Sequence, residues 1–166
     1  MQTTNLPKRK PTRLKDFDYS LPRGYFVTIC TEGRREILST IVGEGLAPPE
    51  AQLSAYGEIA KEQILFLEAQ YSNVKIDSFV IMPNHIHMVL VLHENTGGAS
   101  PSPTISDVVC SFKSRCARAS RKLGFKEKLF QRSFYDHVIR NKEDYKEISK
   151  YIYENPLNWE KDEFFK

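Results

Sequence analysis

Apolar and polar positions along the chain form short runs typical of strands, separated by longer runs with helical spacing. Segments that alternate with period two, or are rich in β-branched and aromatic residues, are predicted strands: 25–30, 74–82, 85–93 and 133–140. Segments with apolar residues at near-helical spacing are predicted helices: 53–69, 105–123 and 142–155. Gly124 and Pro156 are placed to end the second and third helices, and Asn141 to cap the third.

The order of these elements predicts the fold class. Only Pro83 and Asn84 separate two of the strands, which indicates an antiparallel hairpin. The order strand, helix, strand, strand, helix, strand, helix favours an α+β fold of ferredoxin-like type. We therefore expect an antiparallel sheet of about four to five strands packed with helices, and a C-terminal helix that carries Tyr151. Residues 43–50 and 95–104 are rich in Gly, Pro or Ser and are expected loops.

The length of 166 residues suits one domain, which we expect at 25–158, between a basic arm at 1–24 and a tail at 159–166. No apolar run approaches the ~20 residues of a membrane span, and the N-terminus lacks the apolar core of a signal peptide. The three cysteines show no CxxC spacing, which argues against a disulfide framework or a cysteine zinc site. These features favour a cytoplasmic protein with no membrane partner.

The net charge of +3 is unevenly distributed. Residues 105–142 carry ten basic side chains against three acidic ones, and residues 1–24 carry six against two. Such segments are expected where the partner is a polyanion, although solvated helix faces are often Lys-rich without binding anything. The candidate nucleic-acid contacts are Lys8, Arg9, Lys10, Lys113, Arg115, Arg118, Arg121, Lys122, Arg132 and His137.

His85 and His87 lie two residues apart in a predicted strand, so their side chains emerge on the same face, roughly 6–7 Å apart. Ile86 points to the opposite face. Two adjacent imidazoles are a start on a divalent-metal site, but without further ligands two ordinary core or surface histidines on a strand would give the same pattern. Histidine-triad hydrolases need a third alternating His and metallo-β-lactamases an Asp, whereas Val89 occupies that position here.

Tyr151 and Asn155 are four residues apart in the last predicted helix and therefore share one face, while Tyr153 points elsewhere. An amide oxygen can complete a metal site that leaves positions open for substrate. A phenol beside it can attack a phosphoryl group. By itself Tyr151 would be an ordinary aromatic of an amphipathic helix, and Tyr153 remains a rival nucleophile.

Three blocks in the order MPNHIHMVL, QRSFYDHVIRN and YIYENP, preceded by YFVTICTEGRREIL, carry a resemblance to a known family. The chain resembles the single-tyrosine HUH transposases of insertion-sequence type, and among them the REP-associated tyrosine transposases. Insertion-sequence relatives usually have Gln where Asn155 stands, and Asn matches the REP-associated branch. A His-x-His pair alone is a weak signal, so the resemblance rests on the blocks being in register.

The resemblance implies a metal-dependent single-stranded DNA endonuclease and strand transferase that acts at hairpin-bearing DNA. His85, His87 and Asn155 would bind Mg²⁺ or Mn²⁺, and Tyr151 would form a 5′-phosphotyrosine intermediate. The basic segments and His137 would then contact DNA. Several relatives exchange the last helix between subunits, so a homodimer is one expected assembly.

Two other functions stay open at this stage. One is a catalytically silent DNA-binding regulator on the same fold, against which the intact set of His85, His87, Tyr151 and Asn155 argues. The other is an RNA-binding ferredoxin-like module, which would need exposed aromatic rings on its central strands. Phe26 and Phe79 are the few candidates for such rings.

Overall fold

A four-stranded antiparallel sheet forms the centre of the molecule, with the strand order β4-β5-β1-β6. The chain was analysed as a computed structural model that describes residues 17–43, 48–94 and 102–165. The strands of this sheet are β1 (Gly24–Cys30), β4 (Val74–Ile81), β5 (His85–Leu92) and β6 (Tyr135–Val138). All four correspond to predicted strands.

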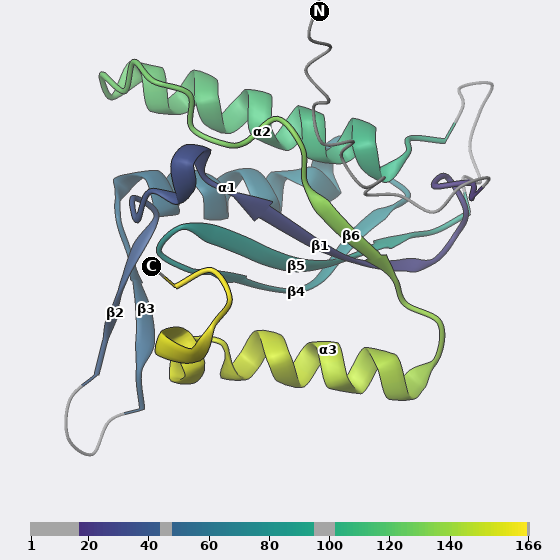
Figure 1. Cartoon of the computed structure of the whole chain (residues 1–166). Coiled ribbons are helices and arrows are strands. Elements are labelled where there is room, and N and C mark those ends of the chain that lie inside the picture. Colours follow the sequence, from purple (N-terminus) through teal and green to yellow (C-terminus); the bar gives the residue numbers. More distant parts are fainter. Residues whose placement is uncertain (1–16, 44–47, 95–101, 166) are drawn as a thin grey trace, which may run out of the picture.

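The described residues form three α-helices, which cover the sheet on both faces (Figure 1). They are α1 (Ala55–Gln70) and α2 (Ile105–Lys122), which pack together on one side, and α3 (Lys142–Glu154), which lies on the other. The predicted cap is present, because the Asn141 side chain accepts a hydrogen bond from the Asp144 backbone N–H. The arrangement confirms the predicted α+β, ferredoxin-like fold.

A small hairpin stands beside the sheet and was not predicted. It consists of β2 (Ser39–Val42) and β3 (Glu50–Leu53), and residues 44–47 between them lie outside the described ranges. Two short 3₁₀ segments were also unpredicted, η1 (Glu32–Arg34) after β1 and η2 (Pro156–Lys161) after α3. Each of these elements is too short to build a clear periodic pattern.

The main core lies between the sheet and the α1–α2 layer. Alternate residues of β5, including Ile86 and Met88, are fully buried in it, as predicted from strand alternation. The intervening residues His85 and His87 face the other side, towards α3. Antiparallel pairing places His87 opposite Thr28 of β1, so this face presents side chains from both central strands.

The position of α3 is fixed by contacts to the edge strand β4. Asp77 lies where the β4–β5 register shifts, and its carboxylate accepts a hydrogen bond from the Tyr145 hydroxyl at 2.7 Å. Bulges of this kind redirect a side chain out of the regular sheet pattern. Together with the buried Ile152, this contact turns one side of α3 towards the sheet. Tyr151 and Asn155 lie on that side.

No helix within the described ranges is long and apolar enough to cross a membrane.

Candidate active site

His85 and His87 lie side by side at the start of β5, with ring centroids 4.4 Å apart and almost no exposure to solvent. Each ring is held through its Nδ1 atom. His85 Nδ1 lies 2.9 Å from the Asn84 side-chain oxygen, and His87 Nδ1 lies 2.8 Å from the Thr28 hydroxyl. Because the Asn84 oxygen only accepts, the His85 proton is assigned to Nδ1, which leaves its Nε2 lone pair available as a ligand.

Burial keeps both imidazoles neutral. It lowers the pKa of His85 to about 4, against the opposing influence of the Asp162 charge and the Asn155 amide. It also lowers the pKa of His87 well below its ordinary value, and the neighbouring His85 adds to that effect. Neutral imidazole is the form that binds a metal ion, so both rings are ready to do so at physiological pH.

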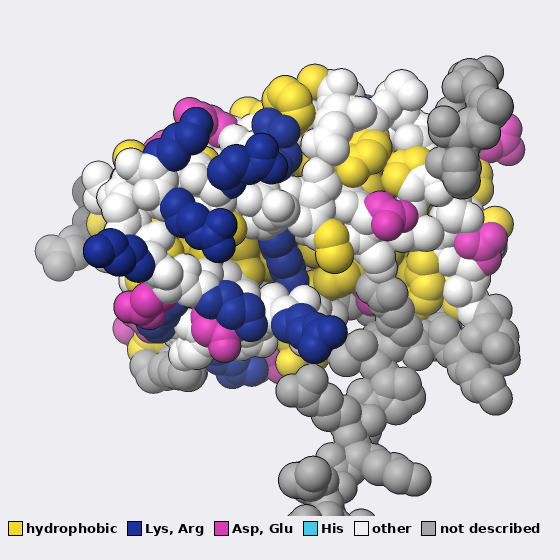
Figure 2. Space-filling view, turned by 90° about the horizontal axis from the view of Figure 1, so that it is seen from above, with side chains coloured by type: hydrophobic (Ala, Val, Ile, Leu, Met, Phe, Trp, Pro, Cys, Tyr) yellow, Lys and Arg dark blue, Asp and Glu magenta, His cyan; other side chains and the backbone are white. Residues whose placement is uncertain are grey.

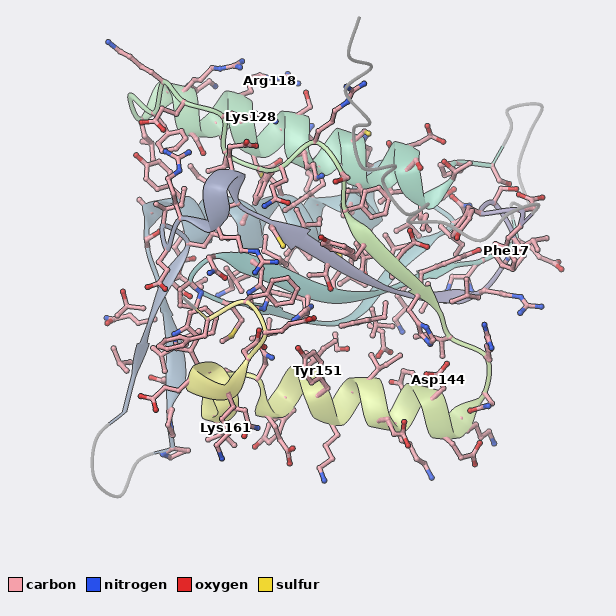
Figure 3. All side chains as sticks on the ribbon, in the orientation of Figure 1. Phe17, Arg118, Lys128, Asp144, Tyr151 and Lys161 are labelled. Atoms are coloured by element: carbon pink, nitrogen blue, oxygen red, sulfur yellow. The ribbon has the colours of Figure 1, made fainter. Side chains whose placement is uncertain are left out.

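The last helix brings the predicted nucleophile to this pair. The Tyr151 hydroxyl lies 3.3 Å from His87 Nε2, and Figure 3 shows Tyr151 between α3 and the sheet. Asn155, one turn further along, is 1% exposed. Tyr153, by contrast, is 82% exposed on the outer side of the helix. The structure therefore brings together the four side chains that the sequence singled out: Tyr151, His85, His87 and Asn155.

Asp162 is a member of the site that sequence reasoning missed. One carboxylate oxygen accepts hydrogen bonds from the Tyr151 hydroxyl at 3.1 Å and from the Asn155 amide nitrogen at 2.8 Å. The other accepts from the Phe164 backbone N–H at 2.7 Å. Ligand atoms of Asp162, His85 and His87 all lie within 4.8 Å of one another. Asp162 follows a short 3₁₀ segment, so no periodicity or motif marks it in the sequence.

Two buried atoms at the centre of the site lack partners. His85 Nε2 and the Asn155 side-chain oxygen are inaccessible to solvent and make no hydrogen bond with any described residue. A buried polar atom left unsatisfied costs free energy, so such atoms call for an explanation. A divalent cation would satisfy both, because imidazole nitrogen, amide oxygen and carboxylate are all suitable ligands. The residues present therefore fit a metal ion.

The same surroundings hold the Tyr151 phenol in its protonated form. Burial raises the pKa of Tyr151, and the negative charge of Asp162 and its hydrogen bond to the phenol raise it further. A positive charge bound near the phenol would oppose both influences.

The segment after α3 forms one wall of the site, including residues expected to be a tail. The Phe164 ring lies 4.5 Å from that of His85, and its backbone oxygen accepts a hydrogen bond from the Asn84 amide at 2.8 Å. Trp159 is also buried here. On the remaining side a pocket of about 450 Å³ opens to solvent past Tyr151, with Lys161 at its lining.

The predicted DNA contacts are widely separated. Lys8, Arg9 and Lys10 lie outside the described residues. On and after α2, four exposed side chains form what we call the basic surface: Arg118, Arg121, Lys122 and Lys128. This surface lies on the α1–α2 side of the sheet, away from Tyr151 (Figures 2 and 3). Arg132, in the segment that follows, is exposed as well.

Two of the predicted DNA contacts are engaged within the protein. The ammonium group of Lys113 donates to the backbone oxygens of Gln131 and Ser133, both at 2.9 Å. Its partial burial lowers the pKa of Lys113 to about 8. Arg115 donates to the Gln63 side chain at 2.7 Å and lies over a phenylalanine ring of α1. Both residues hold neighbouring elements in place.

His137 lies on β6, on the same sheet face as the two histidines of β5. Register pairs it with Phe26, whose ring stacks against His87. His137 Nε2 is 2.9 Å from a carboxylate oxygen of Asp144, near the start of α3. Its side chain is 47% exposed, so it can contact a ligand on this face.

Comparisons with known proteins give the family and agree with the fold. The family model described as "Transposase IS200 like" matches residues 24–155, which include both histidines, Tyr151 and Asn155. An uncharacterized protein of Haemophilus influenzae is 30% identical over 172 residues, covering 95% of this chain and 93% of that protein. The chain belongs to the IS200-like transposase family, and thus to a class of DNA-processing proteins.

Two matches concern REP-associated tyrosine transposases in particular. That of Escherichia coli K12 is 32% identical over 83 residues, covering 50% of this chain and 44% of its own length. A solved structure of a REP-associated tyrosine transposase bound to a REP hairpin superposes with a TM-score of 0.63 at 22% identity. The superposition covers 89% of this chain and 74% of that one, and it bears out the fold.

Proposed function

We propose that this protein is a metal-dependent single-stranded DNA endonuclease and strand transferase that uses Tyr151 as its nucleophile. One observation carries the proposal: the Tyr151 hydroxyl lies 3.3 Å from His87 Nε2, beside the buried unpartnered atoms of His85 and Asn155. A nucleophile next to a set of atoms suited to bind a metal ion is the arrangement that metal-assisted phosphoryl transfer requires. Hairpin-bearing DNA is the proposed substrate, since a relative of the same fold was solved with a REP hairpin.

His85 Nε2, His87 Nε2 and the Asn155 side-chain oxygen would hold Mg²⁺ or Mn²⁺. When bound, such an ion polarises a phosphoryl oxygen as a Lewis acid and favours ionisation of a nearby phenol. The Asn84 and Thr28 side chains, which hold the two Nδ1 atoms, keep the lone pairs of the rings directed into the site.

The contacts of Tyr151 support a proposal for the remaining steps. Its oxygen forms a bond to the phosphorus, and the bond between phosphorus and the 3′-oxygen of the preceding nucleotide breaks. The phenol proton passes to Asp162, whose carboxylate already accepts the hydrogen bond, and then to the departing 3′-oxygen. The products are a 5′-phosphotyrosine and a free 3′-hydroxyl. Attack by a 3′-hydroxyl on the phosphotyrosine reverses the sequence and joins strands.

The basic surface is proposed to bind the DNA backbone. Its side chains are exposed, and among them Lys128 forms an ion pair with Glu32 at 2.9 Å. Phosphate contacts of this kind supply affinity and orientation without reading sequence. Because the surface lies on the opposite side of the sheet from Tyr151, binding and cleavage can be altered separately.

The proposal is tested with a pool of single-stranded DNA hairpins that carry randomised flanks, incubated with Mn²⁺ or Mg²⁺ and resolved on a denaturing gel. We expect the wild-type protein to form a covalent adduct that Tyr151→Phe abolishes while DNA binding persists. Tyr153→Phe is the matched control and should form the adduct normally. An adduct that survives Tyr151→Phe would overturn the assignment of the nucleophile. DNA binding without any wild-type adduct would favour the catalytically silent regulator.

A further inference from the structure

A second pocket, of about 320 Å³, lies beside the candidate active site on the same face of the sheet. Helix α3 makes its main contacts with β4 and β5, so the part of this face formed by β1 and β6 has room for another occupant. The pocket is lined by Phe26, Thr28, Arg34, Tyr135, Asp136, His137, Glu163 and Phe164. Its volume is in the range of pockets that hold small ring compounds.

Exposed rings on β6 form the open side of this pocket. Register pairs Tyr135 with Thr28 and His137 with Phe26, so all four side chains lie on the sheet face that carries the β5 histidines. Tyr135 is 50% exposed and the His137 side chain 47% exposed. Flat aromatic side chains on an open sheet surface are the usual platforms on which unpaired bases stack.

The pocket is continuous with the candidate nucleophile through Phe26. The Phe26 ring stacks on His87 with centroids 5.1 Å apart, and its edge meets the Tyr151 ring at 6.1 Å. A base that stacks in the pocket would therefore be separated from Tyr151 only by the Phe26 ring. This separation suits a nucleotide next to the scissile phosphate.

Arg34 adds a strained, positively charged member to the lining. It has a φ of 52°, a left-handed conformation that is uncommon for a residue other than glycine. Such strain is retained mainly where neighbouring structure enforces it, often at functional sites. The guanidinium lies 4.9 Å from the centre of the Phe164 ring and donates to the Glu163 backbone oxygen at 3.3 Å. A guanidinium has five N–H donors, which leaves others for a ligand.

The charges around the pocket favour a neutral ring over a phosphate. The carboxylate of Glu163, a lining residue, would repel a phosphate placed inside. A nucleobase carries no charge, presents a π-face to aromatic side chains, and has acceptor atoms for an arginine donor. The phosphates on either side of it would then remain outside the pocket.

We infer that this pocket binds one unpaired nucleobase of the single-stranded substrate, next to the phosphate that Tyr151 attacks. Tyr135, His137 and Phe26 would supply stacking, and Arg34 a hydrogen bond to the edge of the base. The inference rests on the proposed function for the identity of the substrate, but binding of the base requires neither the metal ion nor cleavage.

The experiment uses an oligothymidylate that carries one central 2-aminopurine, whose fluorescence is quenched when the base stacks on an aromatic ring. Titration of the full-length protein in EDTA reports affinity and stacking without cleavage. We expect quenching by the wild type, about tenfold weaker affinity with reduced quenching for Tyr135→Ala, and wild-type behaviour for Tyr135→Phe. Tyr153→Ala removes an exposed tyrosine of α3 outside this pocket and should change neither measurement.

The inference would be overturned if Tyr135→Ala and the wild type had the same affinity and quenching. It would also be overturned if Tyr153→Ala lost as much affinity and quenching as Tyr135→Ala. Thermal unfolding of each variant shows whether a loss reflects misfolding, and Tyr135→Phe keeps the test decisive if the alanine variant is unstable. Tyr135-dependent quenching together with no covalent adduct would reject the proposed nuclease and leave the base pocket standing. A covalent adduct together with quenching that does not depend on Tyr135 would support the nuclease and reject the base pocket.

Discussion

At the scale of single residues, a hydrogen bond to Asp162 determines which side-chain atom of Asn155 stays unpartnered. The Asn155 nitrogen donates to Asp162, which leaves the Asn155 oxygen unpartnered within the described site, as is His85 Nε2. The flipped amide would instead place its N–H groups where the ligand oxygen is needed, and nitrogen of an amide does not coordinate. Asp162 therefore holds the Asn155 amide in this orientation, in addition to its contact with the Tyr151 hydroxyl.

Replacing Asp162 should weaken metal binding. We expect Asp162→Ala to lower Mn²⁺ affinity about tenfold, because residues that orient metal ligands typically contribute tenfold to a hundredfold. Asp162→Asn keeps an oxygen that can accept from the Asn155 amide and should restore part of the affinity. Electron paramagnetic resonance of free Mn²⁺ measures this without reference to activity. Glu160→Ala, at an exposed position of η2, is the control, and a similar loss in that variant would argue against a specific role.

The buried histidines should make stability depend on pH. The pKa of His85 in the folded protein is about 4, below the ordinary value of ~6.5, so the unfolded chain binds the proton more readily. The stability that the neutral ring contributes is complete above pH ~6.5 and is lost as the pH falls towards about 4. We expect a loss on the order of 2 kcal/mol in urea unfolding with EDTA present.

The matched variants for this measurement are His85→Gln and His93→Gln. In His85→Gln the free energy of unfolding should fall less steeply as the pH is lowered towards 4. The second changes an exposed residue after β5 and should leave the curve as in the wild type. Identical curves for His85→Gln and the wild type would mean that other groups cause the pH dependence.

At the scale of elements, the long strands and helices could be predicted from the sequence because each repeats its pattern several times. Helix α3 shows this well, since Asn141 caps it as expected and Tyr151 and Asn155 share its inner side. The β2–β3 hairpin could not be predicted, because its strands are four residues long and alternate only weakly. Local pattern gives little information over so few residues.

The same reasoning explains which site residues could be found. His85 with His87, and Tyr151 with Asn155, are pairs within one regular element, so spacing alone places each pair on one face. Asp162 reaches the site only because the chain turns back through η2 after α3. A turn of this kind depends on packing of Trp159 and Phe164 against the sheet, which is tertiary information.

Helix α1 contains Gly57, and helix propensity alone would give the wrong sign for the effect of replacing it with alanine. A Cβ added to Gly57 would clash with the backbone oxygen of Leu38, which also accepts a hydrogen bond from the Ser54 backbone N–H. Alanine favours helix over glycine by about 1 kcal/mol, yet we expect Gly57→Ala to lower the free energy of unfolding by about 2 kcal/mol. The clash is with backbone, so α1 would have to move away from the segment before β2.

Urea unfolding measures this effect, with Ala69→Gly as the control at an exposed position of the same helix. That substitution should cost about 1 kcal/mol through propensity alone. A stabilised Gly57→Ala variant would show that the contact between α1 and Leu38 is loose.

At the scale of the whole molecule, the sheet separates the basic surface from the candidate active site. We expect Arg118→Ala with Arg121→Ala to weaken DNA binding and to reduce its salt dependence. The slope of log affinity against log salt should fall by about 0.7 for each single-strand phosphate contact removed. Lys61→Ala with Lys75→Ala removes the same charge from exposed positions outside the basic surface. An equal change in that variant would indicate a general charge effect.

One chain by itself contains all four candidate site residues: Tyr151 bonds to His87, the His85 and His87 rings are 4.4 Å apart, and Asn155 shares Asp162 with Tyr151. We therefore expect Tyr151 to act on the metal site of its own chain. Mixing His87→Ala protein with Tyr151→Phe protein should then give no covalent adduct, since neither chain has a complete site. Recovery of the adduct in the mixture would show that α3 is exchanged between subunits, and light scattering of the wild type would report the corresponding dimer.

The separation of the two surfaces also has a consequence for the architecture of the DNA target. A strand that leaves the basic surface and enters the pocket beside Tyr151 must pass around an edge of the sheet. Helix α3 packs against β4, so the path with fewer obstructions runs past the other edge strand, β6. On the proposal that the basic surface holds the paired stem, we expect a minimum number of unpaired nucleotides between that stem and the cleavage position. Substrates in which this spacer is shortened stepwise should bind normally until, at one definite length, cleavage stops.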